Sequence, residues 1–404
     1  MTNLDYLYDK EAVKLSLNKE RFVEKKLGYQ IIERGTILPH KKIVDGQTTS
    51  DGWGYGGIID DKNKGIPSSL VHLGAGRFYI PEEVQRSSET VIYLGMFAKT
   101  WGHCITDNIS RLWFLKSEFM EQFKNCPIVY LLCTKDSAFS LERHKSFRRL
   151  LEILEIDIDR LKLIEQPTQF EKIILPNQSF YLHWKDGRQF TKEYREMIDC
   201  VRNFALKNRT PTSTKKIYYF HGARQFGEQY LAEYFRSKGY EIIRPERLTL
   251  DEQLNLLINA ESFASTIGSC SHNSVFLRDG TETILIPRAA EAASGYQMTL
   301  DRVNPLNINY VDSTLSLFYR GNAAYCYIIS EQLKKFFEDK FDGYKEEDFK
   351  IFLEYVKNQL SYKVNPKAKI YYSEFIREFL AQLHKREDLI AAYDMPTDWE
   401  KVLS

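Results

Sequence analysis

Cysteine is scarce in this sequence, and its spacing excludes the usual cysteine-based frameworks. The chain has 404 residues and six cysteines, none of which forms a C-x-x-C pair. This spacing argues against a zinc ribbon and against a disulfide scaffold. We expect reduced thiols, most of them packed in the core.

Long apolar runs and an excess of one charge are also missing. No segment comes near the roughly 18 uninterrupted apolar residues of a membrane-spanning helix, and the first residues do not resemble a secretion signal. The 56 Lys and Arg residues balance the 55 Asp and Glu residues, for a formal net charge of +1. This balance argues against a nucleic-acid-binding protein. We therefore expect a soluble, cytoplasmic protein that does not bind nucleic acid.

Several common catalytic motifs are absent as well. The chain has no G-x-G-x-x-G fingerprint, Walker A loop, H-E-x-x-H or G-x-S-x-G. Asp157 and Asp159 have the D-x-D spacing that can hold a metal–diphosphate, but solvation of a helix end explains them better. The basic segment 143–149 indicates a solvated helix face, with contact to a polyanion or an anionic lipid surface as the lesser alternative.

The sequence does contain a regular alternation of strand and helix patterns, which predicts an α/β protein. The clearest part is 216–286, where four apolar strand patterns alternate with three helices. Thr249 and Glu252 form a predicted capping box at the start of one of these helices. This β-α-β-α-β-α-β order predicts a parallel, doubly wound sheet. A similar alternation begins near residue 91 and includes a predicted helix over 103–119.

The polar, proline-containing segment 208–214 is the best candidate for a linker between two α/β domains. We predict an N-terminal α/β domain over 1–210, a Rossmann-like domain over 211–325, and a helical extension over 326–404 that braces them. Two such domains imply a cleft, and ligands of open α/β sheets bind beyond the carboxyl ends of the strands.

The first candidate site is segment 101–113, which follows a predicted strand and opens a predicted helix. His103, Asp107 and Arg111 are spaced at i, i+4 and i+8, so they would share one helix face. A histidine with a carboxylate one turn away is a plausible general base with its orienting partner. An ordinary helix-surface ion pair is the alternative. Metal ligation is a third interpretation, but no third ligand is evident.

Two further candidates lie in the Rossmann-like domain. In 268–273 a strand meets a small polar turn, where Gly268 permits close approach and a helix N-terminus with nearby serine hydroxyls suits phosphate. A plain capped turn is the alternative. In 221–228, Arg224 could pair with a diphosphate, and Glu228 could stabilise a helix dipole or hold a ribose hydroxyl.

Together these segments resemble glycosyltransferase family 61. The family's aromatic-Gly-His box and its R-L-W continuation resemble Trp101-Gly-His103 and Arg111-Leu-Trp113. Its run from an arginine into an "s-x-x-E-Q" helix resembles the stretch from Arg224 to Glu252-Gln253. Its G-A-x-x-x-N turn resembles 268–273, although Ile267 stands where the family has a histidine.

The resemblance implies a GT-B-like pair of Rossmann-type domains and inversion at the anomeric carbon, with no required metal or other cofactor. It implies a nucleotide-sugar donor, a UDP-sugar being the first expectation, and a saccharide or lipid-linked saccharide acceptor. The role would be bacterial capsule or other surface polysaccharide synthesis, with peripheral membrane association as an option. The implied donor-binding residues are Arg224, Glu228, Glu246, Gly268, Ser269, Ser271, His272 and Asn273. The implied acceptor-binding residues are Trp101 and Arg111, and His103 or Asp107 would be the base.

Three other functions fit the same architecture, because a fold does not fix its chemistry. The first is another two-domain transferase of polysaccharide assembly, such as a pyruvyl or phosphosugar transferase. The second is a non-catalytic subunit that binds a saccharide or a partner enzyme. The third is a metal-dependent transferase that uses the D-x-D pair.

Overall fold

The chain folds into two compact units. The computed structural model describes residues 1–41, 55–70, 78–132, 141, 143–183, 187–222, 225–288, 295–319, 324–361, 369–370, 374–393 and 395. One unit, here the C-terminal unit, comprises Met1–Lys19 and Asn208–Ser404. The other, here the N-terminal unit, is Glu20–Lys207. No helix in the described ranges combines the length and the apolarity needed to cross a membrane.

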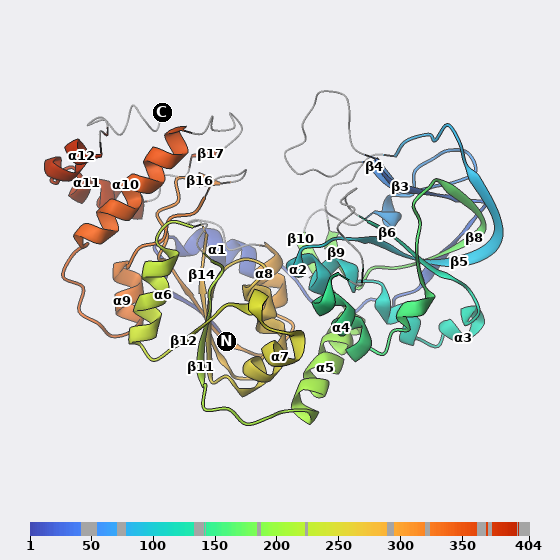
Figure 1. Ribbon diagram of the computed structural model, residues 1–404, viewed down its shortest axis with the longest axis horizontal. Helices are drawn as coiled ribbons and strands as arrows, with labels where there is room; N and C mark the ends of the chain where they lie inside the picture. Colours follow the sequence, from blue (N-terminus) through green and yellow to red (C-terminus); the bar gives the residue numbers. More distant parts are fainter. Residues whose placement is uncertain are drawn as a thin grey trace. The chain divides into compact units, whose positions relative to one another are not determined.

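The C-terminal unit is built on a six-stranded sheet in which every neighbouring pair is parallel. The strands, in spatial order, are β1 (Thr2–Tyr6), β15 (Asn307–Val311), β14 (Glu282–Ile286), β13 (Ser262–Thr266), β11 (Lys216–Tyr219) and β12 (Glu241–Ile243). The intervening helices are α6 (Glu228–Ser237), α7 (Leu250–Asn259) and α8 (Gly295–Leu300) (Figure 1). The predicted doubly wound α/β arrangement is confirmed for this region.

The strand order also defines where the sheet changes direction. The chain runs from β11 outward to β12, then returns across β11 to β13 and continues to β14 and β15. The loops that leave β11 and β13 therefore diverge, which makes a topological switch point between these two strands. In open α/β sheets, this is the place where ligands bind.

Helix α7 begins as its sequence predicts. The Thr249 hydroxyl accepts from the backbone N–H of Glu252, and the Glu252 carboxylate accepts from the backbone N–H of Thr249 at 2.7 Å. This reciprocal pair confirms the capping box and satisfies two donors at the helix start. The helix then buries Leu250, Leu254 and Leu257.

The first 19 residues lie in the C-terminal unit, although the sequence placed them in the N-terminal domain. Strand β1 pairs in parallel with β15, with Thr2 opposite Ile308 and Asn3 opposite Asn309. Helix α1 (Lys10–Leu17) follows it. The sequence of β1, Thr-Asn-Leu-Asp-Tyr, has no apolar alternation that would mark a strand, so only the backbone pairing reveals its place.

The C-terminal helices are part of the same unit rather than a separate extension. They are α9 (Glu331–Phe336), α10 (Glu346–Ser361), α11 (Glu374–Leu383) and α12 (Glu387–Ala392), with a short antiparallel pair, β16 (Phe318–Tyr319) and β17 (Lys369–Ile370). Buried side chains such as Phe352 and Phe379 join α10, α11 and α12 in one core, whereas Leu333 of α9 belongs to the core beside the six-stranded sheet. Tyr8 stacks on Phe375 with ring centroids 4.3 Å apart, which ties the first residues to α11. Their predicted bracing of two domains stays a prediction.

The N-terminal unit has a seven-stranded sheet, which is mixed rather than wholly parallel. Its parallel strands are β8 (Thr168–Pro176), β5 (Gln85–Phe97), β6 (Ile128–Leu132) and β7 (Leu161–Leu163). Strands β2 (Tyr29–Glu33), β3 (Thr36–Lys41) and β4 (Tyr55–Ile59) pair antiparallel. A hairpin-like pair, β9 (Phe180–His183) and β10 (Gly187–Phe190), and the helices α4 (Lys145–Ile153) and α5 (Lys192–Lys207) complete it. The expected Rossmann-type sheet is thus present only in part.

Candidate functional site

Three polar residues and a glycine follow four neighbouring strands of the C-terminal unit at one edge of its sheet. His221 follows β11, Arg244 follows β12, Gly268 follows β13 and Arg288 follows β14. Because the carboxyl ends of parallel strands meet at one edge, these side chains surround the switch point between β11 and β13. Cys270 and His221 show how close the loops are, with Sγ and Nδ1 3.7 Å apart.

Glu228 joins the two diverging loops through hydrogen bonds of its buried carboxylate. Its carboxylate is completely buried, and Oε1 accepts from the His221 backbone N–H at 3.0 Å and from the Thr266 hydroxyl at 3.4 Å. Oε2 is also buried and has no hydrogen-bond partner among the described residues. Burial raises the pKa of this carboxyl to about 7, which the nearby Arg288 charge partly offsets. Glu228 therefore lies beneath the surface, where it holds the loops together.

The helix that carries Glu228 starts at a glycine for a steric reason. Gly227 has a φ of 73°, and a side chain there would lie 1.9 Å from the backbone oxygen of Tyr327. Only glycine fits this close approach in this conformation. The Glu228 carboxylate is thereby fixed at the first turn of α6, where it also favours the helix dipole.

Arg288 is a candidate site residue that the sequence analysis missed. Its guanidinium lies over the Tyr325 ring, 5.0 Å from the centroid. A Cβ on Gly268 would lie only 2.0 Å from Nη2 of Arg288, so the glycine makes room for this cation. Within the described parts of the chain, no hydrogen bond or ion pair holds the guanidinium. Arg288 could have been identified from its position directly after β14, next to the turn that follows β13. Arg224, the predicted cation here, lies outside the described residues.

The turn over 268–273 is braced by its own polar side chains. It leads into a six-residue 3-10 helix, Ser271–Phe276, instead of an α-helix. The Ser271 hydroxyl accepts from the Gly268 N–H at 2.9 Å and lies 2.6 Å from Oε1 of Gln297. The Asn273 amide donates to the Cys270 carbonyl at 3.0 Å. Ser271 and Asn273 are both buried, so in this structure they shape the turn.

The other predicted donor residues differ in exposure. Ser269 is half-buried, whereas His272 is buried with its ring 5.9 Å from that of Tyr296. Glu246 is half-exposed and accepts from Nε of Arg244 at 2.7 Å. Ser269 and Glu246 are therefore more accessible to a ligand than His272.

In the N-terminal unit, His103 and Asp107 form the predicted pair. Nδ1 of His103 lies 2.7 Å from Oδ2 of Asp107. The Asp107 side chain is 1% exposed and the His103 side chain 22% exposed. The buried carboxylate can hold the imidazole by Nδ1–H, which leaves Nε2 as the proton acceptor. This is the geometry of a general base with its orienting carboxylate.

The turn that carries this pair is π-helical rather than part of a long α-helix. Helix α2 covers only Trp101–His103, a π-helical turn follows at Cys104–Asn108, and a 3-10 helix covers Leu112–Lys116. The predicted single helix over 103–119 is therefore wrong. Asn108 explains part of the difference, because its side-chain amide accepts from the Ala98 N–H and donates to the Ala98 carbonyl, both at 2.9 Å. Such π-helical turns are frequent at functional sites.

Arg111 does not share the face of His103 and Asp107. It is completely buried, and it donates from Nε to the Pro176 carbonyl at 3.0 Å and from Nη2 to the Ser68 carbonyl at 2.5 Å. Burial lowers the pKa of its guanidinium to about 10. Among the described residues its guanidinium thus bonds backbone carbonyls and not Asp107, and its role toward an acceptor stays a prediction. Trp101, the other predicted acceptor residue, is half-buried at the start of α2.

Metal ligation gains no support from the described residues. Among them, no group of three or more His, Cys, Asp or Glu side chains is arranged to hold a metal ion. Asp157 of the D-x-D spacing accepts from the backbone N–H of Asp159 at 3.2 Å and so caps a short 3-10 helix.

Comparison with known proteins bears on both sites. Residues 101–284 match the family model described as Glycosyltransferase 61. Among solved structures, the chain is similar to the bacterial iron-containing dodecameric glycosyltransferase TibC from enterotoxigenic E. coli H10407, with 8% identity over 67% of this chain and 80% of that one. The TM-score of 0.24 is too low to carry a fold assignment. No curated protein matches the chain. The family match covers less than half of the chain, and it makes this stretch similar to glycosyltransferases of that family.

Proposed function

We propose that this protein transfers a sugar from a nucleotide-sugar donor, bound at the switch point of the C-terminal unit, to a saccharide acceptor. The observation that carries the proposal is the family match over 101–284. This stretch contains the His103–Asp107 pair and the loops that follow β11, β12 and β13. The matched region thus holds a candidate base and part of a candidate anion site, whose Arg288 lies just beyond it.

The donor side of the proposal rests on the arginines at the sheet edge. Transfer releases a nucleoside diphosphate, whose growing negative charge needs stabilisation. Arg288 beside Gly268 supplies a guanidinium that pairs well with phosphate oxygens. Arg244 lies at the same edge, where its Nη2 would be 3.4 Å from a Cβ on Gly222. Two such cations stabilise the leaving group without a metal, and Arg224 would add a third.

The acceptor side rests on the His103–Asp107 pair. The acceptor hydroxyl oxygen attacks the anomeric carbon, and its proton passes to Nε2 of His103 as the new C–O bond forms. The bond from the anomeric carbon to the diphosphate oxygen breaks, and the nucleoside diphosphate leaves with the electron pair. Asp107, held in the π-helical turn, orients the imidazole and stabilises its charged form. A single displacement of this kind inverts the anomeric centre.

The wider role follows from the resemblance to the family. We propose a saccharide or lipid-linked saccharide as the acceptor, and a place in capsule or other surface polysaccharide synthesis. Reaction with a lipid-linked acceptor would bring the protein to a membrane surface. Of the basic residues in α4, Arg148 and Arg149 both pair with Glu152 at 3.2 Å, which offsets part of their positive charge.

A thermal-shift screen tests the proposed function. The purified chain is heated with UDP, GDP, CMP, several nucleotide sugars and phosphoenolpyruvate, each with and without EDTA. A ligand at about 100 times its dissociation constant stabilises the folded state by about 2.7 kcal/mol, which is readily measured. A shift with one nucleotide class that EDTA does not abolish supports the proposal. A shift with phosphoenolpyruvate alone, or one lost with EDTA, would point to the other transferase classes, and no shift to a binding subunit.

A further inference from the structure

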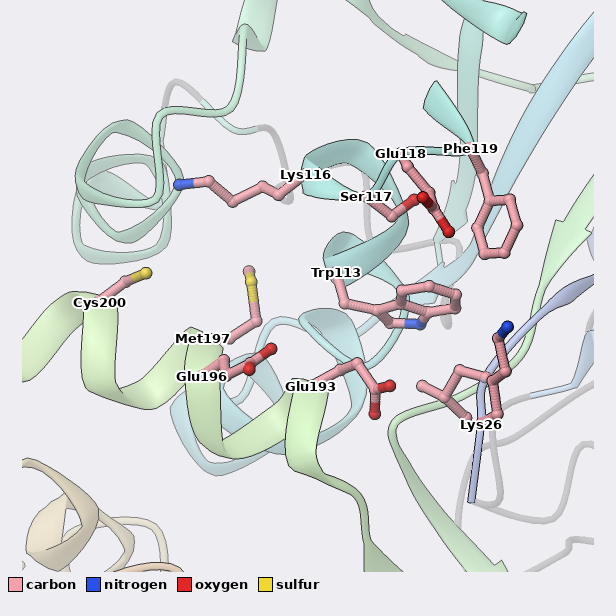
Figure 2. Close-up of a pocket in the computed structure, with 11 residues that line it drawn as sticks. Lys26, Trp113, Lys116, Ser117, Glu118, Phe119, Glu193, Glu196, Met197 and Cys200 are labelled. Atoms are coloured by element: carbon pink, nitrogen blue, oxygen red, sulfur yellow. The ribbon is translucent and has the colours of Figure 1, made fainter. Parts of the chain in front are cut away.

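A pocket in the N-terminal unit has an apolar floor that no part of the proposed mechanism uses. Its volume is about 390 Å³, within the range of small-molecule sites. The side chains of Leu27, Trp113, Phe119 and Met197 line it. All of these except Phe119 are almost completely buried. Figure 2 shows Trp113 at the centre, between Phe119 and helix α5. The floor is thus aromatic and rigidly supported.

The polar atom of Trp113, Nε1, forms a hydrogen bond outside the pocket. Its Nε1–H donates to the Asn177 carbonyl at 2.9 Å, and its ring meets that of Phe119 edge to face at 6.4 Å. The indole therefore supports the floor from beneath, because only 6% of Trp113 is exposed, and the half-buried Phe119 presents more aromatic surface to the pocket. A pre-positioned aromatic ring binds an apolar ligand face with little loss of side-chain freedom.

The rim of the pocket is acidic. Three carboxylates line it: Glu118, Glu193 and Glu196. Glu193 accepts from the Thr191 hydroxyl, Glu118 is exposed, and the exposed Glu196 pairs with Lys192 at 3.2 Å. Two lysines also line the pocket, Lys26 and Lys116 (Figure 2). Lys116 donates its ammonium group to the Leu154 carbonyl and pairs with Glu155 at 3.2 Å. The rim thus offers several hydrogen-bond acceptors, and its three carboxylates outnumber by one the two lysines that line the pocket.

We propose that this pocket is a binding subsite for a pyranose ring of a neutral or amino-bearing saccharide, and that it excludes acidic sugars. A pyranose has apolar C–H faces that suit the floor of Trp113 and Phe119. Its hydroxyl edge donates hydrogen bonds to carboxylates such as those of the rim, whereas a uronate or sialate carboxylate is repelled by them. The mixed character of the pocket matches the mixed surface of a sugar.

The pocket shares its supporting elements with the candidate base, which makes the bound ring part of the acceptor. Trp113 lies ten positions beyond His103 in the same segment. Helix α5 supplies Glu193, Glu196 and Met197 to the pocket, and its Tyr194 hydroxyl donates to the Ile105 carbonyl in the π-helical turn at 2.6 Å. The assignment of this ring to the acceptor rests on the proposed function, whereas the binding of a saccharide here does not.

Cys200 provides the readout, because this free, half-buried thiol lines the pocket (Figure 2). The wild-type chain is alkylated with iodoacetamide, and the rates at Cys200 and Cys126 are followed by peptide mass spectrometry. Cys126 is the matched control, since it is a free, half-buried cysteine of the same unit that does not line the pocket. The probes are the methyl β-pyranosides of glucose, galactose, mannose and glucosamine, and methyl glucuronide.

We expect at least one neutral or amino pyranoside to slow alkylation of Cys200 in a saturable way, by roughly tenfold at ten times its dissociation constant, without slowing Cys126. Methyl glucuronide should protect far less. The exposed substitution Glu118→Lys should narrow that difference, which tests the acidic rim without touching the floor. Equal effects on both cysteines, no protection by any pyranoside, or stronger protection by the glucuronide would each overturn the proposal.

Nucleotide binding is measured on the same preparation by thermal shift, so the two proposals can fail separately. Saccharide protection without a nucleotide shift would remove the proposed donor and leave a saccharide-binding subunit with this pocket. A nucleotide shift without saccharide protection would leave the proposed function and remove the pocket as an acceptor subsite.

Discussion

A single methyl group at Gly268 tests the anion-binding role of Arg288 directly. The Cβ of an alanine there would lie 2.0 Å from Nη2 and 2.6 Å from Cζ of Arg288. The backbone of Gly268 is outside the left-handed region, so alanine adds no backbone strain. Arg288 is half-buried and ends in a flexible side chain. We therefore expect Gly268→Ala to displace the guanidinium from the turn while the fold stays intact.

The size of the effect follows from the contacts that the guanidinium would lose. Its cation–π contact with Tyr325, at 5.0 Å, contributes about 0.5–1 kcal/mol at a partly exposed site, so the unfolding free energy should fall only slightly. Hydrogen bonds from a charged group to the diphosphate contribute about 1.5–3 kcal/mol. The dissociation constant of the nucleotide should therefore rise roughly 10- to 150-fold.

Isothermal titration calorimetry with the nucleoside diphosphate that gives the largest thermal shift measures this change. Gly28→Ala is the control, because the nearest atom to its added Cβ is Oδ1 of Asn177 at 3.8 Å, an ordinary contact. Arg288→Ala should weaken binding about as much as Gly268→Ala, and Gly28→Ala should not. If both substitutions at the switch point leave the affinity unchanged, Arg288 does not bind the diphosphate and the donor site is misplaced.

Three other substitutions test the catalytic and structural claims. Glu228→Gln keeps the oxygen that accepts from His221 and Thr266 but removes a carboxyl whose pKa is raised from 4.5 to about 7. The folded form holds this proton more tightly than the unfolded form. The unfolding free energy of the wild type should therefore fall by up to about 3 kcal/mol, relative to that of the variant, as pH rises from 4.5 through 7. If urea unfolding shows a difference between the two proteins that does not change with pH, this prediction is wrong. Asp107→Asn should lower kcat roughly 10²- to 10⁴-fold in a transfer assay, and full activity would remove it from the mechanism. Thr249→Ala should lower the unfolding free energy by about 1 kcal/mol in urea, whereas no loss would mean that the cap is redundant.

The sheet of the C-terminal unit could be predicted because its local patterns agree with its tertiary structure. Each strand pattern between 216 and 286 is a short apolar run, and the capping box marks the start of α7. Arg288 could not be singled out in the same way. A lone arginine after a strand carries no periodic signal, and its closeness to Gly268 arises only from the parallel pairing of β13 with β14.

Two other features depend on contacts between residues far apart in the chain. Strand β1 pairs with β15, which lies about 300 residues later in the chain. This pairing uses backbone groups, so no side-chain pattern in the sequence predicts it. The segment after Trp101 has a helical pattern, but the hydrogen bonds of Asn108 to Ala98 and of Tyr194 to Ile105 accompany a π-helical turn. A π-helical turn has more residues per turn than an α-helix, so the i, i+4, i+8 rule fails for Arg111.

Hydrogen–deuterium exchange with the nucleotide bound tests the central claim most directly, because it reports where on the chain the donor binds. At a saturating concentration of nucleotide, we predict slower exchange in the peptides that cover the carboxyl ends of β11, β13 and β14 and the segments that follow them. The N-terminal unit, Glu20–Lys207, should change little without an acceptor. Slower exchange confined to the N-terminal unit, or none anywhere at saturation, would contradict a donor site at the switch point.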